Sequence, residues 1–296
     1  MKTENINGVL PVYKEKGYTS NDVVAKLRGI LKIKKIGHTG TLDPEAEGVL
    51  PVCIGRATKL ISMLTDTDKT YSCVCRLGVT TDTEDMTGTV LSQGDISGIS
   101  EADIKKAAEG FTGRYMQIPP MYSAKKINGR KLYELAREGI VIERKPCEVY
   151  INSIDIEGID LENGRFSFMV SCSKGTYIRS LCRDIGEVLG CGAAMESLIR
   201  TAACGFDKDR SLTLSQIEEY SKKGEIGEHI TGIEMMFSGL PEIRLKPEED
   251  KAVINGNILK VTEPDGKYRV YLSDGRFAAV YEIKKNRASL CGYFLT

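Results

Sequence analysis

One aspartate, Asp43, lies in a stretch of small and rigid residues that is suited to holding a reactive side chain in place. The stretch runs from Ile36 to Pro51 and contains three glycines, two prolines and one of the two histidines of the chain. Glycine adopts backbone angles that a Cβ forbids, and Pro44 biases Asp43 away from the helical region. A carboxylate on such a loop can act as a nucleophile or a base. An Asp-Pro pair beside glycine is also an ordinary turn, so this pattern alone leaves both interpretations open.

Other kinds of catalytic site have little support in the sequence. The loop has neither the Gly-Lys-Ser/Thr ending of a P-loop nor the spacing of a dinucleotide fingerprint. Nine cysteines occur without a Cys-x-x-Cys pair, and two histidines do not complete a typical zinc site. We therefore expect reduced thiols, no metal and no cofactor. No apolar run approaches the roughly 18 residues of a membrane span, and Met1 to Gly17 lacks an apolar signal core, so we expect a cytoplasmic protein without membrane contact.

The distribution of charge is more informative than its sum. With 41 basic and 41 acidic residues the formal net charge is zero, which argues weakly against a nucleic-acid partner. Basic residues nevertheless gather in two segments, which contain Lys26, Arg28, Lys32, Lys34 and Lys35, and Lys125, Lys126, Arg130, Lys131, Arg137, Arg144 and Lys145. Two such segments predict a basic face able to follow phosphates, although each could also be only the solvated face of a helix.

The elements around these residues predict an α+β fold. A capping box at Thr19 and Asp22 begins a helix that leads the chain to the Asp43 loop. Residues Lys69 to Val79 alternate as a strand that places Tyr71 on its apolar side. Arg179 falls in the first turn of a later helix, where it opposes the helix dipole, so either a carboxylate partner or simple surface exposure explains it. Further strands are expected at 8–13, 48–55, 149–157, 165–172 and 193–206, and further helices at 57–64, 104–111 and 213–222.

Two segments differ from this body. Residues 119–147 begin with Pro119-Pro120, contain an Asn128-Gly129 turn and read as an excursion from the compact part of the chain. Long segments of this kind are usually functional or mobile. From about Pro241 the pattern changes to a short helix followed by three strands, which predicts a small β-rich domain at 241–296. The main domain would then span residues 1–240.

A longer string of residues resembles a known family. Gly37 to Pro44 reads Gly-His-Thr-Gly-Thr-Leu-Asp-Pro and is followed by Gly48-Val49-Leu50-Pro51-Val52 and Gly55-Arg56-Ala57-Thr58-Lys59. This string, together with Lys69-Thr70-Tyr71 and the turn from Lys174 to Arg179, resembles the TruB family of tRNA pseudouridine synthases. These enzymes act on the TΨC loop. The resemblance extends from about Gly8 to about Leu214 and is much weaker beyond it.

The resemblance implies a fold, a reaction and a set of site residues. It implies a large, mostly antiparallel mixed sheet flanked by helices, a thumb at 119–147 that closes over RNA, and a C-terminal segment that is a reduced or divergent PUA-like domain. The implied reaction converts the uridine at position 55 of the tRNA T-loop to pseudouridine after the base is flipped out. Asp43 would be the catalytic carboxylate, Arg179 its partner, and Tyr71 the residue that stacks on the base and helps to remove the C5 proton. His38 would fill the space that the base leaves, and the remaining RNA-binding residues would be Lys125, Lys126, Arg130 and Tyr177.

Two other functions remain compatible with the residues alone. An RNA-binding or RNA-folding module would bind tRNA without needing Asp43, Tyr71 and Arg179 to meet. A sugar-phosphate or nucleotide enzyme would use the glycine-rich loop, although the sequence has no phosphate motif. For the main hypothesis we expect the T-arm stem-loop of tRNA as partner and a monomeric protein.

Overall fold

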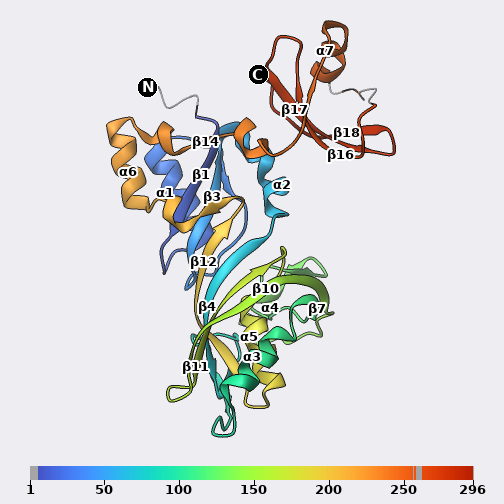
Figure 1. Cartoon of the computed structure of the whole chain (residues 1–296). Helices are drawn as coiled ribbons and strands as arrows, with labels where there is room; N and C mark the ends of the chain where they lie inside the picture. Colours follow the sequence, from blue (N-terminus) through green and yellow to red (C-terminus); the bar gives the residue numbers. More distant parts are fainter. Residues whose placement is uncertain (1–5, 256, 258–261, 296) are drawn as a thin grey trace.

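The centre of the molecule is a ten-stranded sheet that runs through both halves of its main body (Figure 1). The computed structural model describes residues 6–255, 257 and 262–295. The sheet contains β1 (Gly8–Lys14), β2 (Ile36–His38), β3 (Glu47–Ile54), β4 (Lys69–Leu77), β7 (Gly113–Gln117), β10 (Cys147–Asp160), β11 (Arg165–Cys172), β12 (Ala193–Ala203), β13 (Phe206–Asp207) and β14 (Thr231–Gly232).

The strand order is β14-β1-β3-β12-β4-β11-β10-β7, with β2 on β3 and β13 on β12. Every pairing in this sheet is antiparallel except that of β12 with β3. The predicted large, mixed and mostly antiparallel sheet is therefore confirmed. The parallel pair joins the half of the sheet that follows the Asp43 loop to the half that contains β4.

Helices cover the two halves separately. Helices α1 (Ser20–Leu31) and α6 (Leu214–Lys223) lie beside β1 and β3, and α3 (Glu101–Glu109) and α5 (Ile178–Val188) cover the half that contains β4, β10 and β11 (Figure 1). The capping box expected at the start of α1 is present: Asp22 N donates to Thr19 Oγ1 at 3.1 Å, and Thr19 N donates to Asp22 Oδ2 at 2.9 Å. Strand β4 alternates buried and half-buried side chains along its whole length, as predicted for Tyr71.

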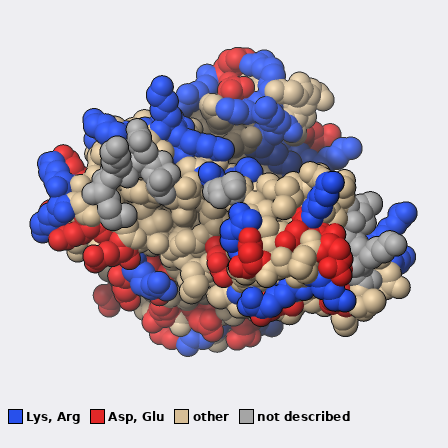
Figure 2. All heavy atoms as spheres, turned by 90° about the horizontal axis from the view of Figure 1, so that it is seen from above, with Lys and Arg blue, Asp and Glu red and all other residues tan. Residues whose placement is uncertain are grey.

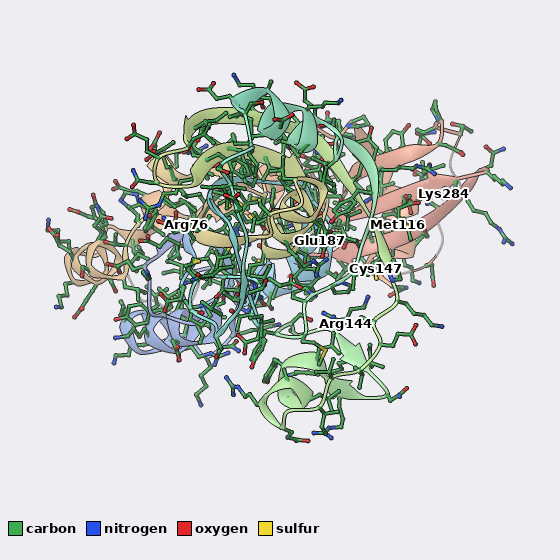
Figure 3. All side chains as sticks on the ribbon, turned by 90° about the horizontal axis from the view of Figure 1, so that it is seen from below. Arg76, Met116, Arg144, Cys147, Glu187 and Lys284 are labelled. Carbon is green, nitrogen blue, oxygen red and sulfur yellow. The ribbon has the colours of Figure 1, made fainter. Side chains whose placement is uncertain are left out.

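Residues 119–147 project from the body as a small unit, here called the thumb. Figure 3 shows it beyond the rest of the chain, with Arg144 and Cys147 near its base. It contains β8 (Lys126–Ile127), β9 (Arg130–Lys131) and α4 (Leu132–Arg137). Met121, Leu132 and Leu135 form a small apolar cluster of its own, which the sequence did not predict.

A second, four-stranded sheet follows the main body. It contains β15 (Glu242–Arg244), β16 (Gly266–Tyr271), β17 (Phe277–Lys284) and β18 (Arg287–Tyr293), with α7 (Pro247–Ile254) beside it (Figure 1). This confirms the expected β-rich C-terminal part, although β15 was not foreseen. Val280 and Phe294 pack in one apolar cluster with Val49 and Leu60 of the main body, and Lys59 Nζ donates to Tyr293 O at 3.0 Å.

The remaining elements are short, and most of them were missed from the sequence. They are η2 (Gly55–Leu60), α2 (Ile61–Thr65), β5 (Val79–Thr81), β6 (Val90–Gln93), η3 (Lys208–Arg210), η4 (Ile226–His229) and η5 (Glu234–Phe237). The strand predicted over 193–206 is interrupted after Ala203. Cys204 and Gly205 both have positive φ, at 56° and 79°, which reverses the chain into β13. In the described residues no helix has the length and apolar character needed to cross a membrane.

Candidate active site

The loop that presents Asp43 is tied to its surroundings on both sides of the carboxylate. Leu42 is 3% exposed, and its backbone N donates to the buried Ser20 Oγ at 2.9 Å. On the other side, the buried Lys14 Nζ donates to Pro44 O at 3.0 Å. Burial lowers the pKa of Lys14 to about 8, because desolvation outweighs the attraction of nearby acids. The loop is therefore anchored on both sides of Asp43, at Leu42 and at Pro44.

Arg179 meets Asp43 at the end of this loop. Its Nε lies 3.0 Å from Asp43 Oδ2, and its Nη1 lies 3.6 Å from Asp85 Oδ2. The same guanidinium donates to Thr83 O at 3.0 Å and to Tyr122 O, in the thumb, at 2.8 Å. The Arg179 side chain is 6% exposed and that of Asp43 is 40% exposed, so the arginine is the buried member of the pair and the carboxylate faces solvent. Arg179 thus has a carboxylate partner and is not a surface residue.

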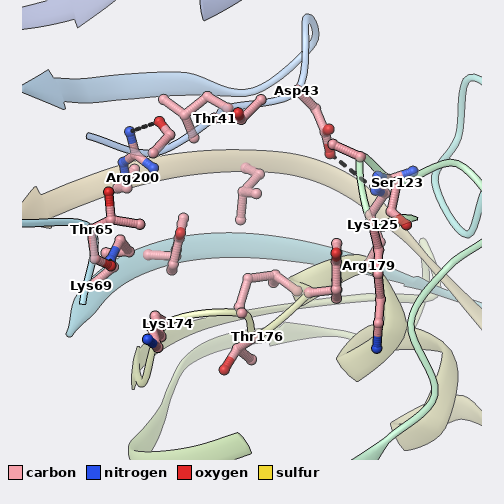
Figure 4. Close-up of a pocket in the computed structure, with 18 residues that line it drawn as sticks. Thr41, Asp43, Thr65, Lys69, Ser123, Lys125, Lys174, Thr176, Arg179 and Arg200 are labelled. Carbon is pink, nitrogen blue, oxygen red and sulfur yellow. Dashed lines mark hydrogen bonds and ion pairs between the residues drawn. The ribbon is translucent and has the colours of Figure 1, made fainter. Parts of the chain in front are cut away.

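The pair opens into a pocket of about 330 Å³ (Figure 4). Asp43, Arg179, Ser123 and Lys125 lie toward one side of this view, and Arg200, Thr65 and Lys69 lie toward the other. Among the described residues, five cationic side chains line the pocket, namely Lys69, Lys125, Lys174, Arg179 and Arg200, whereas Asp43 is the one acidic residue in the lining. Such a composition favours an anionic ligand that also brings an apolar face.

Tyr71 also lines the pocket and lies opposite Arg200 in the sheet. The two residues are paired across β4 and β12, and Tyr71 is 8% exposed while Arg200 is 1% exposed. Burial raises the pKa of the Tyr71 hydroxyl above its usual value, and the positive charge of Arg200 opposes that shift. Tyr71 is therefore a protonated phenol at neutral pH.

The structure places the other predicted residues at different distances from the pocket. Tyr177 lines it and is held by Gln117, whose Nε2 donates to Tyr177 O at 2.9 Å and whose Oε1 accepts from Tyr177 N at 2.8 Å. His38 is half-buried in β2 and is not a lining residue; its Nδ1 accepts from Gly40 N at 3.3 Å. Burial and the charge of Arg200 lower the pKa of His38, so its imidazole is neutral at pH 7.

The predicted cations of the thumb do not form one group. Lys125 lines the pocket, whereas Lys126 and Arg130 lie on β8 and β9 and do not reach it. Arg130 pairs with Glu138 on the thumb itself. The face in Figure 2 carries Lys and Arg mainly over its upper part and more Asp and Glu toward its lower left edge, which agrees with an uneven distribution of charge.

Sequence reasoning missed Arg200 and Lys14, two buried cations at the site. A signal for Arg200 was present: it falls two residues after Leu198, on the core-facing side of an otherwise apolar strand. Asp85 also belongs to the site, because its carboxylate lies 3.6 Å from Arg179 Nη1. Within the described ranges, no three His, Cys, Asp or Glu side chains are grouped so as to hold a metal ion.

Comparisons with known proteins define the class of this site. Residues 28–178 match the model of the TruB family pseudouridylate synthase N-terminal domain, and residues 179–238 match that of the tRNA pseudouridylate synthase B C-terminal domain. The chain is therefore a pseudouridine synthase, an enzyme that isomerises uridine to pseudouridine in tRNA. More narrowly, it belongs to the TruB family, as the resemblance of the Asp43 string implied.

Individual relatives agree with this assignment. The chain is 52% identical to tRNA pseudouridine synthase B of Lachnoclostridium phytofermentans, over 95% of this chain and 97% of that one. It is 46% identical to the protein of the same name from Bacillus pumilus, over 93% of each chain. Among solved structures it resembles a Cbf5-Nop10-Gar1 complex, with a TM-score of 0.72 and 24% identity over 96% of this chain and 83% of that one. The last similarity shows that the fold is shared.

Proposed function

We propose that the chain isomerises the uridine at position 55 in the T-loop of tRNA, and that Asp43 is its catalytic carboxylate. The observation that carries this proposal is the contact of Asp43 Oδ2 with Arg179 Nε at 3.0 Å, at the edge of a pocket of about 330 Å³. A pocket of this size suits one extruded nucleoside and not a base-paired stem. The substrate uridine therefore has to leave its stack, at a cost of a few kcal/mol.

The reaction breaks an N-glycosidic bond and rejoins the base through C5. Asp43 serves it either as a nucleophile or as a base on the sugar, and both routes require the ionised carboxylate. The adjacent guanidinium of Arg179 favours that form. Tyr71 stacks on the extruded base and its hydroxyl faces the region of C5. The neutral imidazole of His38 fills the space in the T-loop from which the base departs.

The thumb holds the RNA over this pocket. Its Lys125 lines the pocket, and Lys126 and Arg130 project from the adjoining hairpin, where they contact phosphates. Tyr177 contributes to the same interface. We further propose that residues 119–147 form an RNA-binding thumb within a catalytic domain at 1–240, and that residues 241–296 form a PUA-like domain. The protein would act as a monomer in the cytoplasm.

The experiment compares Asp43→Asn with the wild-type protein on a T-arm stem-loop that carries C5-tritiated uridine at position 55. We expect Asp43→Asn to fold and to bind the stem-loop with unchanged affinity while releasing no tritium. Asp155→Asn, at an exposed position of β10, is the matched control and should keep full activity. Substantial turnover by Asp43→Asn would contradict the role of the carboxylate. If the wild-type protein released tritium from a stem-loop labelled at another loop uridine, that result would contradict the assignment of position 55 as the target.

A further inference from the structure

Arg200 is a fully buried cation for which the described residues supply no acidic partner. Its side chain is 1% exposed, and in the described part of the chain no ion pair with Asp or Glu involves it. Its Nε donates to Val49 O at 2.7 Å and its Nη2 donates to Gly40 O at 3.2 Å. Burying a guanidinium without a carboxylate is expensive, so the fold retains this charge at a cost. A residue kept at such a cost beside a reaction pocket needs a functional explanation.

The backbone holds Arg200 in one position from two sides. Gly48 has φ of 106°, and a Cβ there would lie 2.2 Å from Arg200 O, so only glycine allows β3 to approach so closely. A β-bulge follows directly, between Arg200 and Ala202 in the pairing with β4. Bulges of this kind commonly aim a side chain beside an active site. The pairing of β12 with β3 and β4 thus fixes the position of Arg200 beside the pocket.

Tyr71 lies beside Arg200 in the sheet. The two residues are direct partners across β12 and β4, so their side chains lie on the same face of the sheet. The positive charge of Arg200 acts on the Tyr71 hydroxyl and opposes the rise in its pKa, as expected for neighbouring side chains of a cross-strand pair. A guanidinium only donates hydrogen bonds, so the phenol oxygen can only accept from Arg200, and the Tyr71 O–H is then left to face the pocket that both residues line.

We propose that Arg200 is a positioning residue, which holds the Tyr71 hydroxyl in a defined orientation relative to the loop that bears Asp43. Its hydrogen bond to Gly40 O connects it to that loop, and its cross-strand pairing with Tyr71 places it beside the phenol of β4. Arg200 therefore sets the spacing between the two groups that act on the sugar and on the base. Arg200 is among the residues that line the pocket, but with 1% exposure it offers almost no surface to the RNA. This inference rests on the proposed function, because it assigns Tyr71 a role in that reaction.

A double-mutant cycle tests this role. Single-turnover rates are measured at saturating T-arm stem-loop for wild type, Arg200→Met, Tyr71→Phe and the double variant. We expect Arg200→Met to lower the rate about 100-fold, as for the loss of one preorganised hydrogen-bond donor, with stem-loop affinity changed less than about threefold. In the Tyr71→Phe background the same substitution should change the rate by less than about threefold. Arg165→Met, at a half-exposed arginine of β11, should have no effect in either background.

Several outcomes would overturn the proposal. An equal loss from Arg200→Met in both backgrounds would show that Arg200 acts independently of the Tyr71 hydroxyl, for instance by holding the fold. Full activity of Tyr71→Phe would remove the role of Tyr71 while leaving Asp43 as the catalytic carboxylate. If Arg200→Met does not fold, Arg200→Lys replaces it in the cycle. If Tyr71→Phe is too slow to measure, 3-fluorotyrosine at position 71 is titrated by fluorine NMR, and a phenol that titrates at the same pH with and without Arg200 contradicts the contact.

Discussion

Replacing Arg179 by lysine separates the charge of this residue from its geometry. The guanidinium bonds to three acceptors at once: it forms an ion pair with Asp43 Oδ2 at 3.0 Å and donates hydrogen bonds to Thr83 O at 3.0 Å and Tyr122 O at 2.8 Å. An ammonium keeps the positive charge but has a single nitrogen, and it cannot reach three acceptors on three segments. Arg179→Lys therefore loses about two of these bonds. At about 1.5–3 kcal/mol each, the lost interaction amounts to about 3–6 kcal/mol.

This loss should appear in two measurements. Thr83 O and Tyr122 O lose their donor in a partly buried region, so we expect the free energy of unfolding to fall by about 2 kcal/mol. If about 2.8 kcal/mol of the lost interaction energy raises the barrier of the reaction, single-turnover tritium release should slow about 100-fold, because each 1.4 kcal/mol corresponds to a factor of ten. Since Tyr122 belongs to the thumb, the variant should also be cleaved faster by protease within residues 119–147.

The control is Arg165→Lys, because Arg165 pairs with Glu196 in a half-exposed position of the same sheet, where an ion pair contributes at most about 1 kcal/mol. Its rate and its unfolding should match those of the wild-type protein. A wild-type rate for Arg179→Lys would refute the argument, because it would mean that positive charge alone satisfies Asp43. A loss of rate without faster cleavage of the thumb would refute the structural link through Tyr122.

Two further perturbations test the loop and the thumb. Lys14 has a pKa lowered to about 8 by burial, so between about pH 8 and 10.5 the unfolded chain binds more protons than the folded one, and stability should rise with pH in that window. Below about pH 8 the buried Lys14 is protonated, and the cost of burying its ammonium lowers the stability of the fold in full. Lys14→Met should lack this rise in urea unfolding curves compared with wild type, and identical pH slopes would argue against a buried, strained ammonium. Replacing Lys125, Lys126 and Arg130 together by glutamine should weaken stem-loop binding and reduce the slope of log affinity against log salt by about 2. The exposed Lys222 and Lys223 of α6, replaced in the same way, are the control; an unchanged salt slope in the thumb variant would rule out its contact with phosphates.

Local features of the fold were accessible from the sequence because they depend on neighbouring residues. The capping box of Thr19 and Asp22 involves residues three apart, and the alternation around Tyr71 reports the period of one strand. The short strands were missed because they leave no local pattern in the sequence. Strands β8 and β9 have two residues each, too few to show a period, and they exist because the chain is paired there.

The sequence by itself determined that a stiff loop presents Asp43, that Tyr71 faces the core and that Arg179 begins a helix, since each follows from local backbone preference. Only the tertiary structure decided that these residues share one pocket, because the loop, β4 and α5 are brought together by the sheet order β3-β12-β4. It also decided the role open to Arg200, whose charge is unremarkable in the sequence. Its burial, its lack of an acidic partner and its position opposite Tyr71 arise from strand pairing, and no local pattern records which strand lies beside which.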